Sequence, residues 1–275
     1  MKVAQESKLA AKLHQIQQSK QRSLYMPYLT LGDPSFDDSF NIVSAMIHGG
    51  ADIIELGIPF SDPTADGPVI QRAMVRAMSA PNYSLNQVFE TTSKIHSHFP
   101  DTALIYLVYM NLVMSEDALS FLTHAAKAGI QALVIPDLPF DSKEADHLGQ
   151  LGASLGIELV GMIAPNTSNR RLKEIASKAS GFIYYVTSLG VTGERSELPA
   201  DLIERLDLVR SCSRVPIFAG FGISRPDQAA SLASHVDGVI AGSVNHRFIE
   251  AEPSHAAEKI EKLTKEFVSV LGPRK

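Results

Sequence analysis

A glutamate in the middle of an apolar segment is the first candidate for chemistry in this sequence. Glu55 lies in IIELGIPF at residues 53–60, where all its neighbours are apolar, glycine or proline. Burying a carboxylate there without a partner would be costly, so its pKa should rise toward neutrality. Such a carboxyl group can act as both general acid and general base. An ion pair between Glu55 and a lysine or arginine across the mouth of the fold explains the residue equally well.

A second carboxyl group follows in a loop whose backbone is restricted by proline and glycine. Asp66 lies in SDPTADGP at residues 61–68, between Pro63 and Pro68. This setting would aim its side chain at a defined point. Asp66 could instead cap the N-terminus of a helix that contains VIQRAMVRAM. Asp62 in the same loop is either a turn former or a contact residue.

Two glycine segments later in the chain have the composition of a phosphate site. GFGIS at 220–224 and AGS at 241–243 contribute Gly222, Gly242 and Ser243. Glycine lets backbone amides approach phosphate oxygens closely, and serine adds a hydroxyl donor. Because neither segment contains lysine or arginine, the backbone amides would hold most of the phosphate. Glycines that serve only turns are the alternative explanation.

The segment GVTGERSEL at residues 190–198 combines small, polar and charged residues, as mobile lids often do. Gly193 could add one amide to the phosphate site. A surface loop without a role explains the same composition.

An apolar pocket is suggested by a set of large side chains near the ends of the predicted strands. As a set they could surround a flat ring, although packing inside the fold is the better explanation for any single one. These residues are Tyr28, Leu107, Tyr109, Tyr184 and Phe221.

The elements that must position these residues alternate between short β-branched or aromatic segments and longer amphipathic ones. Several of the short segments are continuous apolar runs, which is typical of strands buried on both faces. The predicted strands are 24–31, 51–58, 102–109, 131–137, 157–163, 181–187, 215–220 and 237–242.

Amphipathic helices are predicted between the strands. In the last of them, within AEKIEKLTKEFVSVLG, Ile260, Leu263 and Phe267 form a stripe at helical spacing. We therefore predict an α/β fold: a single-domain (β/α)8 TIM barrel over residues 1–275 with an extra N-terminal helix. A doubly wound sheet of six strands is the alternative. In such a barrel the active site lies at the carboxyl ends of the strands, which would bring the carboxyl groups and the glycine segments together.

Composition excludes several other classes of protein. Twenty-five basic and 30 acidic residues give a net charge of −5, so attraction to nucleic acid or anionic lipid is not expected. The single cysteine, Cys212, excludes an intrachain disulfide framework and favours the reducing cytoplasm. No apolar run reaches the roughly 20 residues needed to span a bilayer. The scattered histidines support no metal site, since His96 and His98 would not share a helix face.

Six segments in order along the chain resemble the signature segments of tryptophan synthase alpha chains. They are MPYLTLGDP, ELGIPFSDPTADGPVIQ, VYMNLV, GVTG, GFGIS and AGS, which together run through nearly the whole chain. The segment with Glu55 and Asp66 is highly specific to this family. The glycine segments taken singly are shared by other phosphate-binding barrels.

The resemblance implies a lyase of tryptophan biosynthesis that cleaves indole-3-glycerol phosphate to indole and D-glyceraldehyde 3-phosphate by a retro-aldol reaction. Glu55 matches the family's catalytic glutamate, and Asp66 matches the aspartate that accepts the indole N–H. The matched phosphate-binding positions are Gly193, Gly222, Gly242 and Ser243. The matched indole pocket comprises Leu107, Tyr109, Tyr184 and Phe221, to which we add Tyr28.

The resemblance also implies a partner, the tryptophan synthase beta chain, in an allosteric α2β2 heterotetramer. Pyridoxal phosphate is expected only in that partner, and no cofactor in this chain. Asp62 and Thr192 match segments that communicate with the partner. Three departures from the common pattern, at Thr64, Tyr28 and Ser188-Leu189, bear on the lid and on the coupling rather than on the chemistry.

Three other functions are compatible with these residues. A stand-alone lyase would use the same chemistry and release free indole. A binding or regulatory module would keep the barrel and the phosphate site without turnover, although it would need neither Glu55 nor Asp66. Another phosphosugar lyase or isomerase would have no use for the aromatic residues together with the Glu55 segment.

Overall fold

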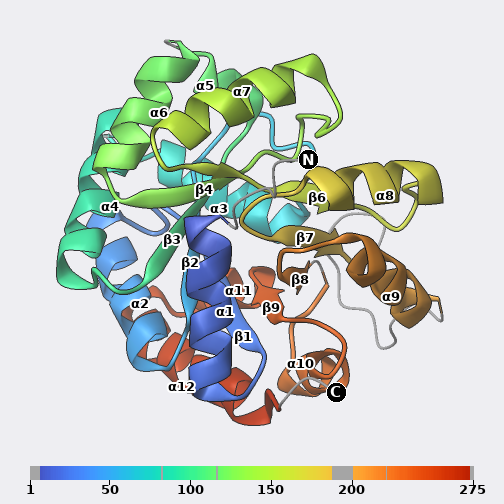
Figure 1. Ribbon diagram of the computed structural model, residues 1–275. Coiled ribbons are helices and arrows are strands. Elements are labelled where there is room, and N and C mark those ends of the chain that lie inside the picture. The colour runs from blue at the N-terminus through green and yellow to red at the C-terminus, as the bar shows by residue number, and fades with distance from the viewer. Residues whose placement is uncertain (1–6, 82, 116, 188–200, 221, 273–275) are drawn as a thin grey trace.

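A ladder of parallel strands surrounded by helices is the frame of the molecule (Figure 1). The computed structural model describes residues 7–81, 83–115, 117–187, 201–220 and 222–272. Nine strands are paired in the order β5-β4-β3-β2-β1-β9-β8-β7-β6. Their bounds are β1 (Leu24–Thr30), β2 (Ile53–Gly57), β3 (Ala103–Leu107), β4 (Ile130–Val134), β5 (Glu158–Leu159), β6 (Gly161–Ile163), β7 (Ile183–Val186), β8 (Ile217–Gly220) and β9 (Gly238–Ala241).

The two ends of this ladder are consecutive pieces of the chain, so the sheet closes into a barrel. Strand β5 pairs with β4, and β6 pairs with β7. Only Val160 separates them, and its N–H donates to the carbonyl of Leu133 at 2.9 Å. The eight predicted strand regions and the barrel are therefore confirmed. The fifth region is interrupted because the chain changes neighbours at Val160.

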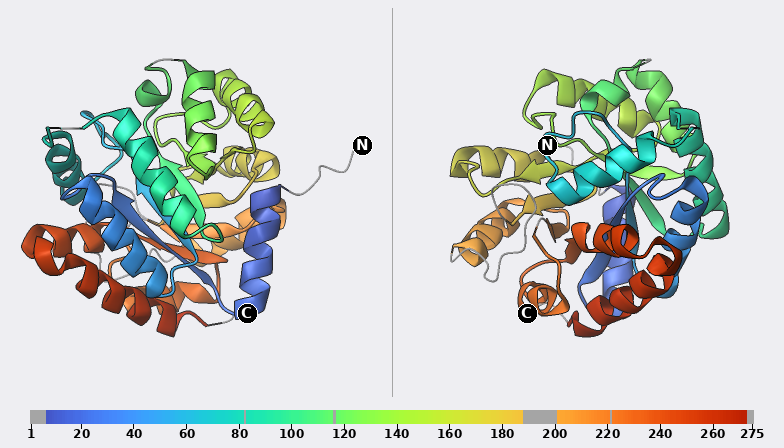
Figure 2. Two further views of the ribbon diagram at one scale, coloured as in Figure 1. Left: turned by 90° about the vertical axis from the view of Figure 1, so that its left-hand side faces the viewer. Right: turned by 180° about the vertical axis from the view of Figure 1, so that it is seen from behind.

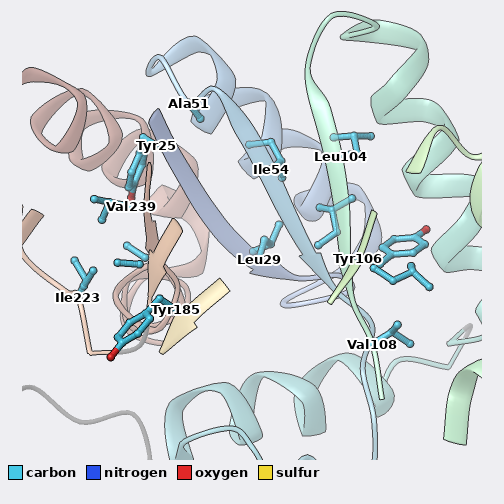
Figure 3. Close-up of a cluster of buried hydrophobic side chains, with 14 of the residues drawn as sticks. Tyr25, Leu29, Ala51, Ile54, Leu104, Tyr106, Val108, Tyr185, Ile223 and Val239 are labelled. Carbon is cyan, nitrogen blue, oxygen red and sulfur yellow. The ribbon is translucent and has the colours of Figure 1, made fainter. Parts of the chain in front are cut away.

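Each strand contributes to two cores, because successive side chains point to opposite faces of a strand. In β1, Leu24, Met26 and Tyr28 belong to the cluster inside the barrel. Tyr25 and Leu29 point outward and pack in the layer between the sheet and the helices (Figure 3). All seven residues of β1 are buried, which explains why the segment is apolar without polar alternation.

Helices cover the outside of the barrel, and many begin at a polar residue whose side chain accepts a backbone N–H. Ser35, Ser84, Asp117, Ser142 and Ser168 are such N-caps. The helices are α2 (Phe36–His48), α3 (Pro68–Met78), α4 (Leu85–His98), α5 (Met110–Val113), α6 (Ala118–Lys127), α7 (Lys143–Ser154), α8 (Asn169–Lys178), α9 (Leu202–Cys212), α10 (Pro226–Ala233), α11 (Ser243–Ala251) and α12 (Ala256–Val270), with a 3-10 turn, η1 (Pro253–His255), before α12.

The predicted extra helix, α1 (Lys8–Lys20), lies across the end of the barrel where the strands begin (Figure 1). Leu9 and Leu13 belong to the cluster inside the barrel, together with Phe182 and Phe218. The hydroxyl oxygen of Ser7 accepts the N–H of Gly181 at 3.0 Å. Because α1 closes this end, ligands must approach from the carboxyl ends of the strands.

Within the described ranges, no helix combines the length and apolar character needed to cross a membrane.

Removal of one ring on the outer layer should measure how strongly the last helix holds the barrel. Phe267 of α12 is fully buried and stacks on Tyr25 of β1 with ring centroids 4.9 Å apart. We expect Phe267→Ala to lower the free energy of unfolding by about 3–5 kcal/mol, because it leaves a cavity. Urea unfolding measures this change. The control Glu266→Ala, at an exposed position of α12, should change it by less than about 0.5 kcal/mol. Equal effects of the two substitutions would contradict the packing argument.

Candidate active site

Glu55 is held inside the barrel by a strand, not at its surface. It lies in β2, in register with Tyr28 of β1, and is 1% exposed. Among the described residues, its Oε1 has no hydrogen-bond partner and no lysine or arginine pairs with it. Burial raises the pKa of Glu55 to about 8, and the negative charge of Asp66 contributes in the same direction. Among the described residues, no cation forms the ion pair that would explain Glu55, so that explanation is wrong for them.

Asp66 is buried as well, but it has a hydrogen-bond donor. The hydroxyl of Tyr109 donates to its Oδ2 at 2.6 Å, and the N–H of Ala65 donates to the same Tyr109 oxygen at 3.1 Å. Phe60 stacks on Tyr109, with ring centroids 5.0 Å apart. Burial raises the pKa of Asp66, and the hydrogen bond from Tyr109 partly offsets this rise. The resulting pKa is about 6. Helix α3 has Gly67 as its N-cap, so the N-cap explanation of Asp66 is wrong.

The two carboxyl groups differ in charge at neutral pH. With pKa values of about 8 and about 6, Glu55 is mostly protonated at pH 7 and Asp66 is mostly ionised. The difference arises because Asp66 accepts a hydrogen bond, whereas Glu55 lies deeper and no described residue donates one to its Oε1. One acid and one anion in the same site can perform two different tasks.

One cavity at the carboxyl end of the barrel brings most of the predicted site residues together. Its empty space is about 430 Å³ and is open to solvent. Its walls comprise Tyr28, Glu55, Asp66, Ile70, Leu107, Tyr184, Gly222, Ile223, Ile240, Gly242 and Ser243.

Among the described residues, one predicted pocket residue lies elsewhere. Tyr109 holds Asp66 and is not among the residues that line the cavity. Asp62, predicted to contact the partner, is exposed outside the cavity, and its role stays a prediction. Gly193, Thr192 and Phe221 lie outside the described residues.

Three isoleucines of the cavity wall were not predicted from the sequence: Ile70, Ile223 and Ile240. Ile223 lies inside the GFGIS segment, so its position beside Gly222 was an available signal. Ile70 and Ile240 have no such signal, because apolar residues of a helix or strand pack in a core far more often than they contact a ligand.

Two glycines at strand ends make room for the tyrosines of the cavity. A Cβ atom on Gly57 would overlap the hydroxyl group of Tyr28, and one on Gly220 would overlap the hydroxyl group of Tyr184. The close approach of ring to backbone, which only glycine permits, determines the shape of the cavity.

The glycine segments contribute a left-handed turn and a helix N-terminus to the cavity wall. Gly222 has φ +85°, a conformation that L-residues with a side chain rarely adopt. Gly242 is the N-cap of α11, and Ser243 is the first residue of that helix. Free N–H groups and the positive end of the helix dipole favour an anion at this point.

A second cavity lies beyond the loop that carries Asp66. Its empty space is about 1430 Å³ and is open to solvent, and Thr64 and Ala65 of that loop line it. Its remaining walls are mainly apolar and include Ile135, Leu138, Phe140, Val160 and Met162.

No group of three or more histidine, cysteine, aspartate or glutamate side chains that could bind a metal ion is found in the described ranges.

Comparison with known proteins identifies one family. The model of the family described as "Tryptophan synthase alpha chain" matches residues 14–271. A tryptophan synthase alpha chain of Leptospira biflexa is 43% identical over 250 residues, which cover 91% of this chain and 93% of that one. One from Lacticaseibacillus casei is 40% identical over 258 residues, covering 93% and 94%.

Solved structures agree with the sequence comparison. The tryptophan synthase subunit alpha from Legionella pneumophila superposes with a TM-score of 0.84 at 29% identity, covering 95% of this chain and 97% of that one. A chain of Mycobacterium tuberculosis tryptophan synthase superposes with a TM-score of 0.86 at 28% identity, covering 97% and 99%.

The raised pKa of Glu55 should make stability depend on pH. The folded protein retains a proton up to a pKa of about 8, whereas the unfolded chain loses it near the ordinary value of 4.5. Stability contributed by this proton is therefore complete below about pH 4.5 and is lost as the pH rises toward 8. The free energy of unfolding should therefore fall between pH 5 and pH 8.5 by less in Glu55→Gln than in the wild type. We expect the two decreases to differ by on the order of a few kcal/mol. Urea unfolding at both pH values measures the difference.

The exposed Glu258 on α12 provides the matched control. Glu258→Gln removes the same charge at the surface and should follow the wild type at both pH values. If Glu55→Gln behaved like Glu258→Gln, burial of an unpartnered carboxyl group at Glu55 would be disproved.

Proposed function

Since this chain belongs to the tryptophan synthase alpha chain family, we propose that it cleaves indole-3-glycerol phosphate to indole and D-glyceraldehyde 3-phosphate. The observation that carries the proposal is one cavity with a protonated Glu55 and an ionised Asp66 near neutral pH, together with the N-terminus of α11. The substrate has matching parts: a ring that must be protonated, a ring N–H that needs an acceptor, and a phosphate.

The indole ring would lie between the apolar walls contributed by Tyr28, Leu107 and Tyr184, with the three isoleucines completing the pocket. Phe221 is included in this proposal on the strength of the family pattern. Tyr109 would act from behind, because its hydroxyl group orients the carboxylate of Asp66.

In the first step Glu55 transfers its proton to the ring carbon that bears the glycerol side chain. The ring loses aromaticity and becomes an indoleninium ion, whose positive charge extends to the ring nitrogen. Asp66, as a carboxylate, accepts the ring N–H and stabilises that charge. A carboxyl group with a pKa near 8 is a suitable donor at neutral pH.

In the second step Glu55, now a carboxylate, removes the proton of the hydroxyl group next to the ring. The oxygen forms a carbonyl group, the carbon–carbon bond breaks, and its electron pair returns to the ring and restores aromatic indole. The Glu55 carboxyl group ends protonated, as it began. The tautomerised ring is the electron sink, so these steps require neither a metal nor a Schiff base.

The phosphate would bind at Gly222, Gly242 and Ser243, through backbone N–H groups and the serine hydroxyl. Gly193 is included in this proposal through its match to the family. With the phosphate anchored, the reacting carbon is held beside Glu55 without further bonds to the glycerol chain.

A tryptophan synthase beta chain is the partner that the family implies, and we propose an allosteric α2β2 heterotetramer. Pyridoxal phosphate would belong to the beta chain, which condenses indole with L-serine to give L-tryptophan. The second cavity supports transfer of an apolar product, because it adjoins the Asp66 loop and has mainly apolar walls. Asp62 and Thr192 are the residues proposed for communication with the partner.

We also propose that residues 1–275 form one domain and that the enzyme works in the cytoplasm. The continuous barrel ladder supports the first proposal. A phosphorylated substrate, which does not cross membranes freely, supports the second.

Indole formation is the direct test of this function. The wild type should release indole from indole-3-glycerol phosphate, and an added beta chain should accelerate the reaction greatly. Glu55→Gln should lower the cleavage rate by roughly 10²- to 10⁴-fold, the contribution typical of a general acid–base residue. Near-normal activity of Glu55→Gln would remove Glu55 from the mechanism. Wild-type protein that bound the substrate without forming indole, even with the partner, would favour a binding module, and absence of acceleration would favour a stand-alone lyase.

Asp66→Asn should separate charge stabilisation from phosphate binding. The amide keeps the size of the side chain but removes the negative charge opposite the indoleninium ion, so we expect roughly a 10²-fold or larger loss of kcat. Inhibition by glycerol phosphate, measured alongside, should remain normal, since the proposed phosphate site consists of Gly222, Gly242 and Ser243 and does not include Asp66. A loss of phosphate affinity with unchanged kcat would mean that Asp66 has a different role.

A further inference from the structure

A buried ionic cluster behind the cavity has no part in the mechanism described above. Asp33 follows β1, and its carboxylate is fully buried. Arg76 of α3 donates to both carboxylate oxygens, with Nε–Oδ1 and Nη2–Oδ2 distances of 2.8 Å. His246 of α11 binds Oδ2 through Nδ1 at 2.7 Å. Three segments of the chain thus meet at one carboxylate.

The bonds of His246 determine which ring nitrogen carries the proton. Its Nε2 accepts the backbone N–H of Thr30 at 3.0 Å, so Nε2 is unprotonated in this arrangement. Nδ1 therefore carries the hydrogen and donates to Asp33. The neighbouring Asn245 donates from Nδ2 to the carbonyl of Tyr28 at 3.1 Å. The first turn of α11 is consequently attached to β1 at two backbone positions.

The pKa of Asp33 is shifted in the opposite direction from the pKa of Glu55. Burial alone would raise the pKa of Asp33, but hydrogen bonds from His246 and Arg76 outweigh it and hold this pKa below its usual value. Asp33 is therefore a stable anion. A buried anion with two fixed donors is a rigid junction, because loss of either donor leaves charge uncompensated.

The helices that meet at Asp33 carry the two ends of the proposed substrate site. Helix α3 begins at Pro68, two residues after Asp66, and its Gln71 donates to the carbonyl of Asp66 at 2.9 Å. Helix α11 begins at Ser243, beside the proposed phosphate. The rear view in Figure 2 shows α3 (cyan) and α11 (orange-red) side by side at the end of the barrel away from α1.

We propose that Asp33, Arg76 and His246 form a positioning network that sets the separation between the acid end and the phosphate end of the site. This inference rests on the proposed function, since it assumes a ligand that occupies both ends at once. A ligand with two binding groups gains affinity and rate only if both subsites are held at the matching distance. A ligand that occupies one end does not depend on that distance.

Helix α3 offers a matched control one turn earlier. Arg72 binds Glu250 of α11 through two bonds of 2.7 and 2.8 Å, so it joins the same two helices. The side chains of this pair are 52% and 36% exposed, whereas the carboxylate of Asp33 is fully buried. Exposed pairs of this kind contribute little. Arg72→Met and Arg76→Met therefore remove the same charge from the same helix, at the surface and at the junction.

The experiment compares whole and divided ligands on the full-length protein. Dissociation constants would be measured by calorimetry for indole, for glycerol 3-phosphate, and for an uncleavable ligand in which a saturated three-carbon chain joins indole to phosphate. The kcat and KM for indole-3-glycerol phosphate would be measured in parallel. Arg76→Lys, which keeps the charge and loses the two-pronged contact, serves as the second variant if Arg76→Met does not fold.

We expect Arg76→Met to lower the affinity for the joined ligand and kcat/KM by roughly 10- to 100-fold. Its affinities for indole and for glycerol 3-phosphate should change by less than about twofold, and Arg72→Met should leave all four values within that range. Arg76→Lys should give an intermediate loss on the joined ligand.

The network is disproved if Arg76→Met and Arg72→Met behave alike while the wild type is active. It is also disproved if glycerol 3-phosphate loses as much affinity as the joined ligand, since the cluster would then support only the phosphate end. The network is likewise disproved if the wild type binds the joined ligand no more tightly than it binds indole or glycerol 3-phosphate alone. Binding of the joined ligand requires no turnover. A wild type that binds this ligand without forming indole from indole-3-glycerol phosphate would contradict the proposed reaction. The affinities of the variants for the joined ligand would still test the network.

Discussion

The burial of two carboxyl groups in one cavity, with no cation among the described residues that line it, is the constraint on which the rest of the site depends. Water would stabilise both as anions, whereas the interior of the barrel penalises charge and each anion repels the other. The protein accommodates the pair by making them unequal: Tyr109 donates a hydrogen bond to Asp66, and no described residue donates one to Oε1 of Glu55. An acid and an anion at neutral pH are the result, and they are the two states that the proposed cleavage requires.

The barrel provides the rigidity that this arrangement needs. Glu55 lies on a strand bonded to neighbours on both sides, so its backbone cannot move away from the cavity. Asp66 lies on a loop and depends on Tyr109 and on Gln71 of the following helix. Helix α1 closes the opposite end, and the open end therefore contains all the chemistry. Strand, loop and helix terminus thus contribute one part each to the same cavity.

Three buried carboxyl groups in this chain illustrate how surroundings decide function. Asp33 has two cationic or N–H donors and a lowered pKa, Asp66 has one phenolic donor and a moderately raised pKa, and Glu55 has the highest pKa of the three. The first is suited to holding helices together, the second to stabilising a cation, and the third to transferring a proton. The residue type is nearly the same, and the number and charge of its donors make the difference.

Sequence alone determined the eight strand regions, the alternating helices, and the choice of Glu55 and Asp66, because hydrophobic periodicity and a carboxyl group within an apolar run are local features. Tertiary structure decided the division of the fifth strand at Val160, the use of Tyr109 as the donor to Asp66, and the space that Gly57 provides for Tyr28. It also decided the junction at Asp33, whose bond to His246 joins residues 213 positions apart. Contacts between such distant residues leave no pattern in either neighbourhood, since they arise only when the closed barrel brings the two segments together.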